Sequence, residues 1–203
     1  MANLKVFYNS DLIEAGCDEA GRGCLSGPVV AASVVLPKDF KHPMLDDSKK
    51  LTEKKRGILE PYIRENAISC QIGVVFESEI DKINILNASF LAMHRSLSKH
   101  KILIQHILVD GNRFLSYNDI PHTCIVGGDA KMMSIAAASI LAKNYRDRWM
   151  QKLHEKYDFY GWDRNKGYPT KEHRAAILNY GASPHHRMTF SLLPNNGQVK
   201  MFS

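Results

Sequence analysis

Four acidic residues stand where the chain could gather oxygen ligands for metal ions. Asp18 and Glu19 are adjacent and follow a short apolar segment, Asp110 ends the apolar run 104–109, and Asp129 follows two glycines. Clustered carboxylates favour hard, oxygen-binding cations such as Mg²⁺ or Mn²⁺. Two such ions roughly 3.5–4 Å apart activate a water molecule and stabilise the leaving oxygen in phosphodiester cleavage. The pattern therefore predicts a metal-dependent hydrolytic site built from these four side chains.

Each acid also has an interpretation without chemistry. An Asp-Glu pair beside glycine is typical of a polar turn, Asp110 suits a turn, and Asp129 suits the start of a helix. Neighbouring side chains on a strand point to opposite faces, so Asp18 and Glu19 converge only if the strand ends or bulges there. The glycines that follow permit either outcome. These alternatives stay open for single residues, but acids beside glycines at strand ends and helix starts are typical of sites in α/β folds.

The sequence patterns of several other kinds of catalytic site are not found in this chain. The glycines at 21, 23 and 27 do not follow the dinucleotide spacing G-x-G-x-x-G, and no phosphate-binding loop G-x-x-x-x-G-K-[ST] is present. No G-x-S-x-G nucleophile motif occurs either. The four cysteines form no C-x-x-C pair, which disfavours a zinc site or a disulfide framework and favours free thiols in a reducing cytoplasm.

Basic and aromatic residues are placed as a nuclease requires. Lys49 lies at the start of a predicted helix, and Lys143 and Arg146 are expected on the polar side of a long helix. Such cations contact phosphates without reading sequence, although a solvated helix face is the commoner explanation for them. Tyr168 lies in the loop 166–170 between glycine and proline, where its ring could stack on a sugar or base, or simply pack.

Hydrophobic periodicity predicts an α/β fold in which a mixed sheet is flanked by helices and followed by a helical C-terminal portion. Strands are expected at residues 29–36, 68–76, 104–109 and 123–126. Helices are expected at residues 51–66, 87–100, about 132–157, and 171–180. Thr52 and Thr170 are the expected N-caps, Gly181 is the expected stop, and Pro61 should end or kink its helix.

The chain as a whole is typical of a globular protein. Its 203 residues are expected to form a single domain, 1–203, with a loose tail at 194–203. The formal net charge of +6 favours a polyanionic partner. No apolar run reaches the ~18 residues that span a bilayer, and residues 1–10 lack the features of a signal peptide, so we expect a cytoplasmic protein without membrane contact. No heptad repeat indicates self-association, so we expect a monomer.

Taken in order, motifs along the chain resemble those of the ribonuclease HII family, the type 2 ribonucleases H. The similarity covers about residues 12–192, and the extra N-terminal domain of the sister family ribonuclease HIII is not seen. The matching motifs are DEAGRG (18–23), GPVVAA (27–32), DSKKLTEKKR (47–56), INILNASFLAM (83–93), VDGN (109–112), GGDAK (127–131), SIAAASILAK (134–143), KGYPT (166–170) and GASPHHR (181–187).

The resemblance implies a ribonuclease H-like fold and a specific activity. It implies an endonuclease that cuts the RNA strand of RNA–DNA hybrids and incises at single ribonucleotides embedded in duplex DNA. It also implies 5′-phosphate and 3′-hydroxyl product ends. The four-acid site of the family corresponds to Asp18, Glu19, Asp110 and Asp129, which would coordinate two Mg²⁺ or Mn²⁺ ions.

The resemblance further implies how the substrate is recognised. Backbone groups of Gly21, Arg22 and Gly23 would read the ribose 2′-hydroxyl, which is the group that distinguishes RNA from DNA. Tyr168 would pack on the neighbouring deoxyribose. The remaining expected substrate contacts are Lys49, Lys143, Arg146 and Lys166.

One residue departs from the family pattern, and one family partner lacks support. Cys24 stands where family members often have proline, beside the segment that would read the ribose. The stretch 194–203 contains no recognisable clamp-binding motif, so docking to a replication clamp is unsupported.

Two other functions remain as alternatives. The first is a non-catalytic module that binds hybrids or RNA, and the four acids argue against it because unneutralised carboxylates repel phosphates. The second is another metal-dependent nuclease of the same broad fold that cuts DNA. Cleavage of an all-DNA duplex, compared with its single-ribonucleotide counterpart, separates the second alternative from a ribonuclease.

Overall fold

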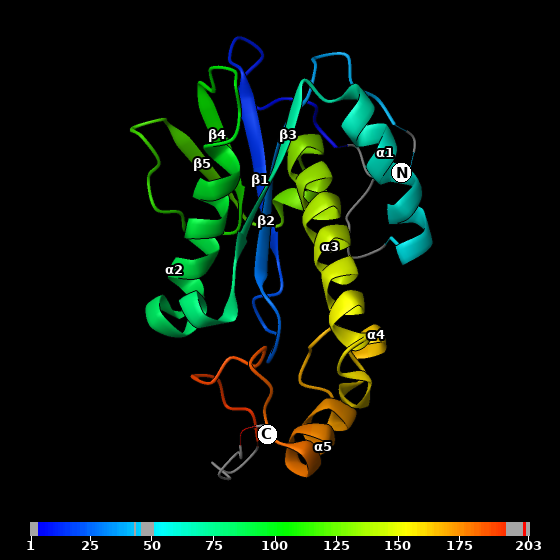
Figure 1. Ribbon diagram of the computed structural model, residues 1–203. Helices are drawn as coiled ribbons and strands as arrows, with labels where there is room; N and C mark the ends of the chain where they lie inside the picture. The colour runs from blue at the N-terminus through cyan, green and yellow to red at the C-terminus, as the bar shows by residue number, and fades with distance from the viewer. Residues whose placement is uncertain (1–3, 43, 46–50, 194–200, 202–203) are drawn as a thin grey trace.

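The described part of the chain forms a five-stranded sheet that mixes parallel and antiparallel pairing. The structure is a computed structural model that describes residues 4–42, 44–45, 51–193 and 201. The strands are β1 (Glu14–Ala20), β2 (Val29–Val35), β3 (Ser69–Val75), β4 (His106–Asp110) and β5 (His122–Ile125). They lie in the order β3-β2-β1-β4-β5, with antiparallel neighbours from β3 to β1 and parallel neighbours from β1 to β5 (Figure 1). The expected mixed sheet is confirmed.

Helices cover both faces of this sheet. They are α1 (Glu53–Asn66), α2 (Glu77–Leu97), α3 (Met133–His154), α4 (Trp162–Asn165) and α5 (Lys171–Tyr180), with the 3₁₀ turns η2 (Gly128–Ala130) and η3 (Asp158–Tyr160). α1 and α3 pack on one face and α2 packs on the other, while α4 and α5 lie below the sheet in the view of Figure 1. The fold is α/β with a helical C-terminal portion, as expected.

Strand β2 carries the core on both of its faces. All seven of its residues are buried, and alternate side chains of a strand point to opposite faces. Val30 and Val34 join the apolar cluster under α1 and α3, whereas Val29 and Val35 join the cluster under α2. A strand covered on both faces is apolar along its whole length, which is why it could be predicted from the sequence.

The first half of α3 lies close to β1 because the facing residues are small. A methyl group added at Gly16 of β1 would overlap the backbone of α3 at Ser134. Four buried alanines of α3 continue this contact with the sheet: Ala136, Ala137, Ala138 and Ala142. The close approach brings Ser139 and Lys143, from the same helix, to the C-terminal end of β1.

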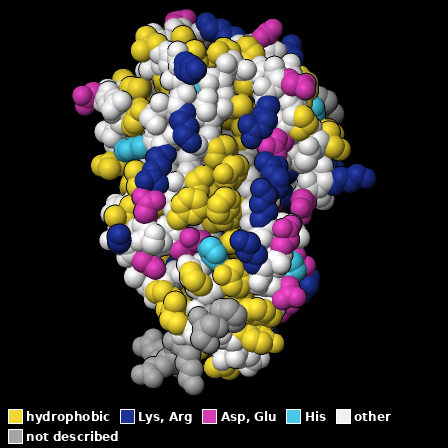
Figure 2. Space-filling model, in the orientation of Figure 1, with side chains coloured by type: hydrophobic (Ala, Val, Ile, Leu, Met, Phe, Trp, Pro, Cys, Tyr) yellow, Lys and Arg dark blue, Asp and Glu magenta, His cyan; other side chains and the backbone are white. Residues whose placement is uncertain are grey.

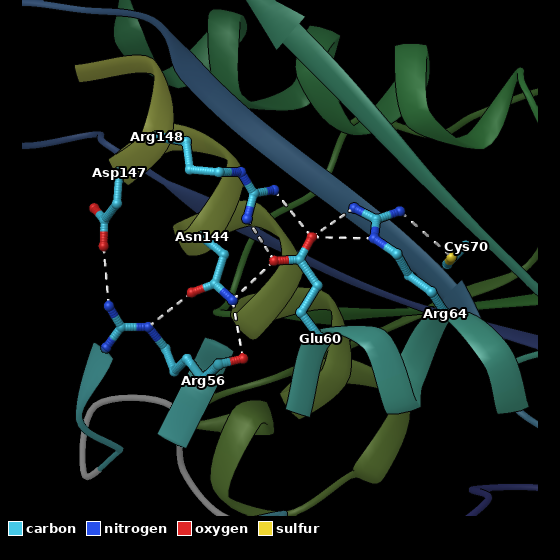
Figure 3. Close-up of polar contacts among 7 residues, drawn as sticks. All are labelled: Arg56, Glu60, Arg64, Cys70, Asn144, Asp147 and Arg148. Carbon is cyan, nitrogen blue, oxygen red and sulfur yellow. Dashed lines mark hydrogen bonds and ion pairs between the residues drawn. The ribbon is translucent and has the colours of Figure 1, made fainter. Parts of the chain in front are cut away.

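A buried carboxylate joins α1 to α3 (Figure 3). Glu60 of α1 accepts hydrogen bonds from Arg148 and Asn144 of α3 and from Arg64 of its own helix. Burial raises the pKa of Glu60, but these hydrogen bonds outweigh it and bring the pKa to about 2. The carboxylate is therefore ionised at neutral pH and holds the two helices together.

A second part of the same network fixes the start of α1. The guanidinium of Arg56 is buried and donates to Asp147 at 2.9 Å and to Asn144 at 3.2 Å, both on α3 (Figure 3). It also donates to the Leu51 carbonyl at 2.9 Å. The backbone just before α1 is thus attached to α3 through one side chain.

Strand β3 forms one edge of the sheet, and two basic side chains cover its outer carbonyls. Arg95 of α2 donates to the Val74 carbonyl at 2.8 Å, and Lys99 donates to the Ile72 carbonyl at 2.6 Å. Alternate residues of an antiparallel strand direct their backbone groups to the same side. Both carbonyls therefore face away from β2.

Pro61 does not end its helix, which excludes one of the two outcomes expected for it. α1 continues past Pro61 to Asn66. The proline cannot donate to the Gly57 carbonyl one turn earlier. Gly57 and Pro61 are both exposed, so water can satisfy that carbonyl and the helix tolerates the missing hydrogen bond.

The second helix begins at Glu77, ahead of the expected start, and its part after Asn84 corresponds to the helix predicted at 87–100. Asn84 interrupts α2 with φ 64° and ψ 165°. Its side chain accepts the Asn87 N–H at 3.1 Å, so it caps the segment that follows. The apolar periodicity identified only this second segment, because the first segment is rich in charged residues.

The other predicted elements agree with the structure within a few residues. Thr52 and Thr170 accept hydrogen bonds as the N-caps of α1 and α5, and α5 stops before Gly181 as expected. Met201 pairs with Ala182 through an isolated β-bridge, and the rest of the expected tail lies outside the described residues. All four cysteines are free. Within the described residues, no helix has the length and apolar character needed to cross a membrane.

Candidate active site

Three of the four predicted acids meet at one edge of the sheet. Cys17 of β1 pairs with Val109 of β4 in a parallel ladder, so the residues that follow each of them, Asp18 and Asp110, are neighbours. Glu19 joins them, and all three carboxylates line a cavity of about 470 Å³. β1 ends one residue beyond Glu19. Asp18 and Glu19 are still paired with β2, in the last residue pairs of the ladder before β1 ends, and both line the cavity.

Burial and mutual repulsion make this cluster electrostatically costly. Asp18 is 6% exposed, and burial raises its pKa well above the ordinary value, with the charges of Glu19 and Asp110 adding to the effect. A hydrogen bond from the Ser139 side chain opposes the rise. Burial also raises the pKa of Glu19, against the nearby Arg22 guanidinium at 3.2 Å. Such a cluster of carboxylates is stabilised by a bound cation.

Asp129 lies next in the chain to a residue whose backbone contacts the cluster. The Gly128 N–H donates to Oδ1 of Asp110 at 2.7 Å, and Asp129 follows in η2 with 1% exposure. Asp129 does not line the cavity that holds the other three acids. It is also not the N-cap of α3, because Met132 occupies that position. Asp129 is therefore not a helix cap, but it lies in the first turn of η2, which is the other position expected for it.

The donor set suits a hard divalent cation without enclosing one. Within the described ranges, no three Asp, Glu, His or Cys side chains are arranged as a ready metal site. The three acidic side chains that line the cavity are nevertheless carboxylates, the ligands that Mg²⁺ and Mn²⁺ prefer. Mg²⁺ usually keeps several waters and binds through one or two carboxylates plus substrate phosphates. The residues present fit that mode of binding.

A second cavity adjoins the first and shares part of its wall. It has a volume of about 290 Å³ and is also lined by Glu19, Arg22 and Asp110. Its other walls come from Ser89 and Phe90 of α2 and from the loop after β4. The carboxylates therefore lie between two hollows, which together offer room for a nucleotide strand on either side of them.

The expected substrate-binding residues fall into two groups. Gly21, Arg22, Gly23, Lys143 and Tyr168 all line the first cavity, as the resemblance implies. Gly21 has φ +97°, a backbone conformation that favours glycine.

The other expected contacts are placed differently. Lys49 lies outside the described residues. Lys166 is half-buried and does not line the cavity; its backbone carbonyl accepts a hydrogen bond from Arg146 at 2.7 Å. Lys166 therefore contributes a backbone group to the structure around the cavity.

Arg146 is not on the polar side of its helix, which corrects the expectation from periodicity. Its residue is 2% exposed, and its guanidinium donates to the carbonyls of Ser26, Pro28 and Lys166. Loops distant in sequence fold over this part of α3 and bring their carbonyls to the arginine. Helical spacing alone cannot reveal that arrangement.

Two cavity residues escaped the sequence analysis. Arg56 and Ser139 both line the cavity. A signal for Ser139 was available, because it lies one helical turn before Lys143 and therefore on the same face. Arg56 lies in a charged helix among other basic residues, and nothing in its spacing distinguishes it from them.

Cys24 lies against Tyr168. The two side chains are hydrogen-bonded to each other, and Cys24 is completely buried. Burial raises the pKa of the Cys24 thiol, so the group is neutral at physiological pH. The cysteine thus supports the hydroxyl end of the tyrosine, whose residue is 42% exposed.

The chain is similar to proteins that carry the name ribonuclease HII. A family model described as Ribonuclease HII matches residues 15–193. Ribonuclease HII from Bacteroides thetaiotaomicron is 60% identical over 198 residues, which are 98% of this chain and 98% of that protein. Ribonuclease HII from Parabacteroides distasonis is 61% identical over 191 residues, which are 94% of this chain and 96% of that protein.

Solved structures share the fold. Ribonuclease H2 from Pyrococcus horikoshii OT3 has a TM-score of 0.74 at 27% identity, covering 88% of this chain and 94% of that chain. RNase HII from Archaeoglobus fulgidus, solved in complex with PCNA, has a TM-score of 0.70 at 26% identity, covering 83% and 88%. Bst-RNase HIII, solved in complex with Mn²⁺, has a TM-score of 0.65 at 20% identity, covering 83% and 61%. The expected ribonuclease H-like fold is confirmed.

Proposed function

Since the chain belongs to the ribonuclease HII family and is a ribonuclease H, an enzyme class that acts on RNA–DNA hybrids, we propose a two-metal mechanism for it. In this proposal the metal ligands are Asp18, Glu19, Asp110 and Asp129. The enzyme cuts the RNA strand of hybrids, incises at single ribonucleotides in duplex DNA, and leaves 5′-phosphate and 3′-hydroxyl ends.

One observation carries the proposal: three carboxylates share a cavity with the glycine segment, residues 21–23. The acids supply cation ligands, and the segment presents backbone groups beside them. A ribose 2′-hydroxyl bound by the segment would lie next to the phosphate that the acids serve. Recognition of RNA and cleavage are then performed in the same small volume.

Divalent cations bound at the carboxylates would activate the attacking water and neutralise the leaving oxygen. The protein groups around them hold the substrate. Lys143 is placed to contact a phosphate, and the exposed ring of Tyr168 is placed to pack on a sugar. The carboxylate of Asp110 is itself oriented by the Gly128 N–H.

Either Mg²⁺ or Mn²⁺ fits the proposed site, because both ions bind oxygen ligands. The oxygen donors suit either cation, and Bst-RNase HIII was solved with Mn²⁺. A monomeric, single-domain, cytoplasmic enzyme remains our prediction. For clamp docking we make no proposal, because most of the stretch 194–203 lies outside the described residues.

The variant Asp110→Asn tests the metal role. Asparagine keeps a carbonyl oxygen that can accept the Gly128 N–H, so the fold should be retained. We expect Mg²⁺-dependent cleavage of a duplex with one ribonucleotide to fall by at least about a thousandfold, since the variant removes a charged cation ligand. Thermal unfolding checks the fold of the variant, and retained cleavage would exclude the assigned role.

The substrate preference is tested with three matched duplexes: all-DNA, one embedded ribonucleotide, and a continuous RNA–DNA hybrid. We expect cleavage of the second and third and none of the first. Cleavage of the all-DNA duplex would identify a DNA nuclease instead. Binding without any product would identify a non-catalytic module.

A further inference from the structure

A single buried guanidinium touches both segments that are proposed to recognise the substrate. Arg146 donates from Nε to the Pro28 carbonyl at 3.0 Å and from Nη2 to the Ser26 carbonyl at 2.9 Å. Both carbonyls belong to the chain that follows the glycine segment. From Nη1 it donates to the Lys166 carbonyl at 2.7 Å, two residues before Tyr168. One side chain therefore connects two loops that are far apart in the sequence.

Arg146 also lies directly beneath the glycine segment. A Cβ atom at Gly21 would overlap Nε of Arg146. The segment can approach the guanidinium this closely only because residue 21 is glycine, whose φ of +97° other residues rarely adopt. The backbone that faces the cavity on one side therefore rests on Arg146 on the other.

A second buried arginine holds the same segment from the opposite end. Arg187 is fully buried and donates twice to the Gly27 carbonyl, at 3.0 and 2.8 Å, and once to the Arg22 carbonyl at 3.1 Å. The backbone N–H of Leu25 donates to the Gly167 carbonyl at 2.8 Å. The loop between β1 and β2 is thus held both by the helix beneath it and by the Tyr168 loop beside it.

We propose that Arg146 is a positioning residue that sets the separation between the glycine segment and Tyr168, and through it the preference of the enzyme for a ribose followed by a deoxyribose. The inference rests on the proposed function, in which the segment binds the ribose and Tyr168 packs on the next sugar. A substrate with one ribonucleotide needs both contacts at once. A continuous hybrid offers a ribose at every position and depends less on their separation.

Lysine cannot replace Arg146 in this role. Its single ammonium cannot match the planar fork of the guanidinium, which addresses three carbonyls in fixed directions. Arg146→Lys keeps the positive charge but should let the two loops shift apart. Arg148→Lys is the matched control, because Arg148 lies on the same helix and binds Glu60 rather than the loops.

The measurement is kcat/KM on two substrates, a duplex with one ribonucleotide and a continuous hybrid. We expect Arg146→Lys to lower the first by about tenfold to a hundredfold, the scale of a misplaced binding group. We expect a loss of less than about threefold on the second, on the same scale. Arg148→Lys should change neither. Equal losses on both substrates would indicate a purely structural role and overturn the proposal.

A double-mutant cycle with Tyr168→Ala tests the coupling directly. If Arg146 positions the tyrosine, removing the ring from the Arg146→Lys variant should cost much less activity than removing it from the native enzyme. Additive effects would overturn the proposal even if both single variants were impaired. A structural role alone would not produce this loss of additivity.

Asn165→Ala provides a second variant in case Arg146→Lys does not fold. The Asn165 side chain accepts the Gly167 N–H at 2.8 Å and so holds the turn that presents the Lys166 carbonyl. Its removal should cause the same selective loss on the single-ribonucleotide duplex, and an unselective loss would count against the proposal. If the native enzyme does not cut that duplex at all, the proposed function fails first and independently of Arg146.

Discussion

Neighbouring side chains in the cavity change one another's pKa values. The buried carboxyl of Asp18 has a raised pKa, and the hydroxyl of Ser139 is a neutral group that counteracts the rise. Ser139 is therefore placed to favour the ionised form that a cation requires. Under the proposed function, Ser139 would support a metal ligand and so affect metal affinity without contacting the metal.

Ser139→Ala should weaken the response to Mg²⁺. Without the hydroxyl, a proton competes better for Asp18, so the Mg²⁺ concentration at half-maximal cleavage should rise by about tenfold, and less at higher pH. Ser134→Ala is the matched control, since it removes a buried hydroxyl from the same helix outside the cavity. Identical Mg²⁺ responses of the two variants would contradict the role of Ser139.

A chain of neutral histidines supports the Tyr168 loop. Nε1 of Trp162 donates to Nε2 of His173 at 3.0 Å, and Nδ1 of His173 then donates to the Tyr168 carbonyl at 2.9 Å. His186 donates to the same His173 Nε2 at 3.1 Å and accepts the Ser183 N–H at 2.9 Å. Every ring nitrogen is used with both imidazoles uncharged, so neither can take up a proton without losing a hydrogen bond.

This network predicts the acid sensitivity of the fold. Burial, with a smaller effect from His173, lowers the pKa of His186 to about 3. Between pH 6.5 and about 3, the unfolded chain binds a proton there that the folded protein excludes, so stability falls as pH drops through this interval. Urea unfolding should show a steeper pH dependence for the native protein than for His186→Gln. Parallel curves would contradict the assignment.

The sequence predicted the grouping of the acidic residues but not the burial of Arg146. Asp18, Glu19 and Asp110 were expected together because they are acids beside glycines at the ends of apolar segments. The structure adds that β1 and β4, which carry them, are parallel neighbours. Arg146 was misplaced because helical spacing describes only the helix itself. The loops that bury it come from residues 26–28 and 166, and no local pattern indicates that they meet.

At the scale of elements, regular patterns were predictable and interruptions were not. α5 was predicted from its periodicity, its Thr170 cap and its Gly181 stop, all of which are local signals. The break in α2 at Asn84 depends on a single residue with positive φ, and the helix before it lacks an apolar stripe that could be recognised. A boundary set by the backbone conformation of one residue lies beyond a periodic sequence pattern.

Two glycines show different reasons for lacking a side chain. Gly73 lies in a tight contact, whereas Gly57 lies at an exposed helix position where alanine has the higher helix propensity. Gly73 of β3 faces α2 so closely that a methyl group would overlap the Ala92 carbonyl, whereas a methyl group at Gly57 of α1 would meet no atom within 4 Å. Gly73→Ala should therefore destabilise the protein by more than about 2 kcal/mol. Gly57→Ala should stabilise it by about 0.5–1 kcal/mol. Denaturant unfolding measures both, and a tolerated Gly73→Ala would exclude the tight β3–α2 contact.

For the whole molecule, the net charge of +6 is the sum of acidic and basic groups that lie in different places. Three acids share the cavity, whereas many lysine and arginine side chains lie on the surface. On the face shown in Figure 2 they flank a central apolar patch above the space between α2 and α3. The basic surface attracts a polyanion, and cations at the acidic cluster would remove the local repulsion.

Binding to a hybrid should therefore depend strongly on salt. With the uncleaving Asp110→Asn variant, log Kobs should fall linearly with log salt concentration, by about 0.9 per phosphate neutralised. Adding Lys143→Ala should reduce the slope by about one such unit, because Lys143 lines the cavity. Adding Lys101→Ala should not, since Lys101 is exposed before the opposite end of β4. Equal slopes for all three proteins would contradict a phosphate contact at Lys143.

The covered edge of β3 has a consequence for how the protein behaves at high concentration. An incoming strand from another copy would need the Val74 and Ile72 carbonyls, which Arg95 and Lys99 already occupy. It would also have to desolvate two cations to displace them, and charged edges of this kind disfavour strand addition. Strand addition along this edge is thus disfavoured. Arg95 and Lys99 line neither of the two cavities, and they disfavour polymerisation of the protein through backbone pairing at β3.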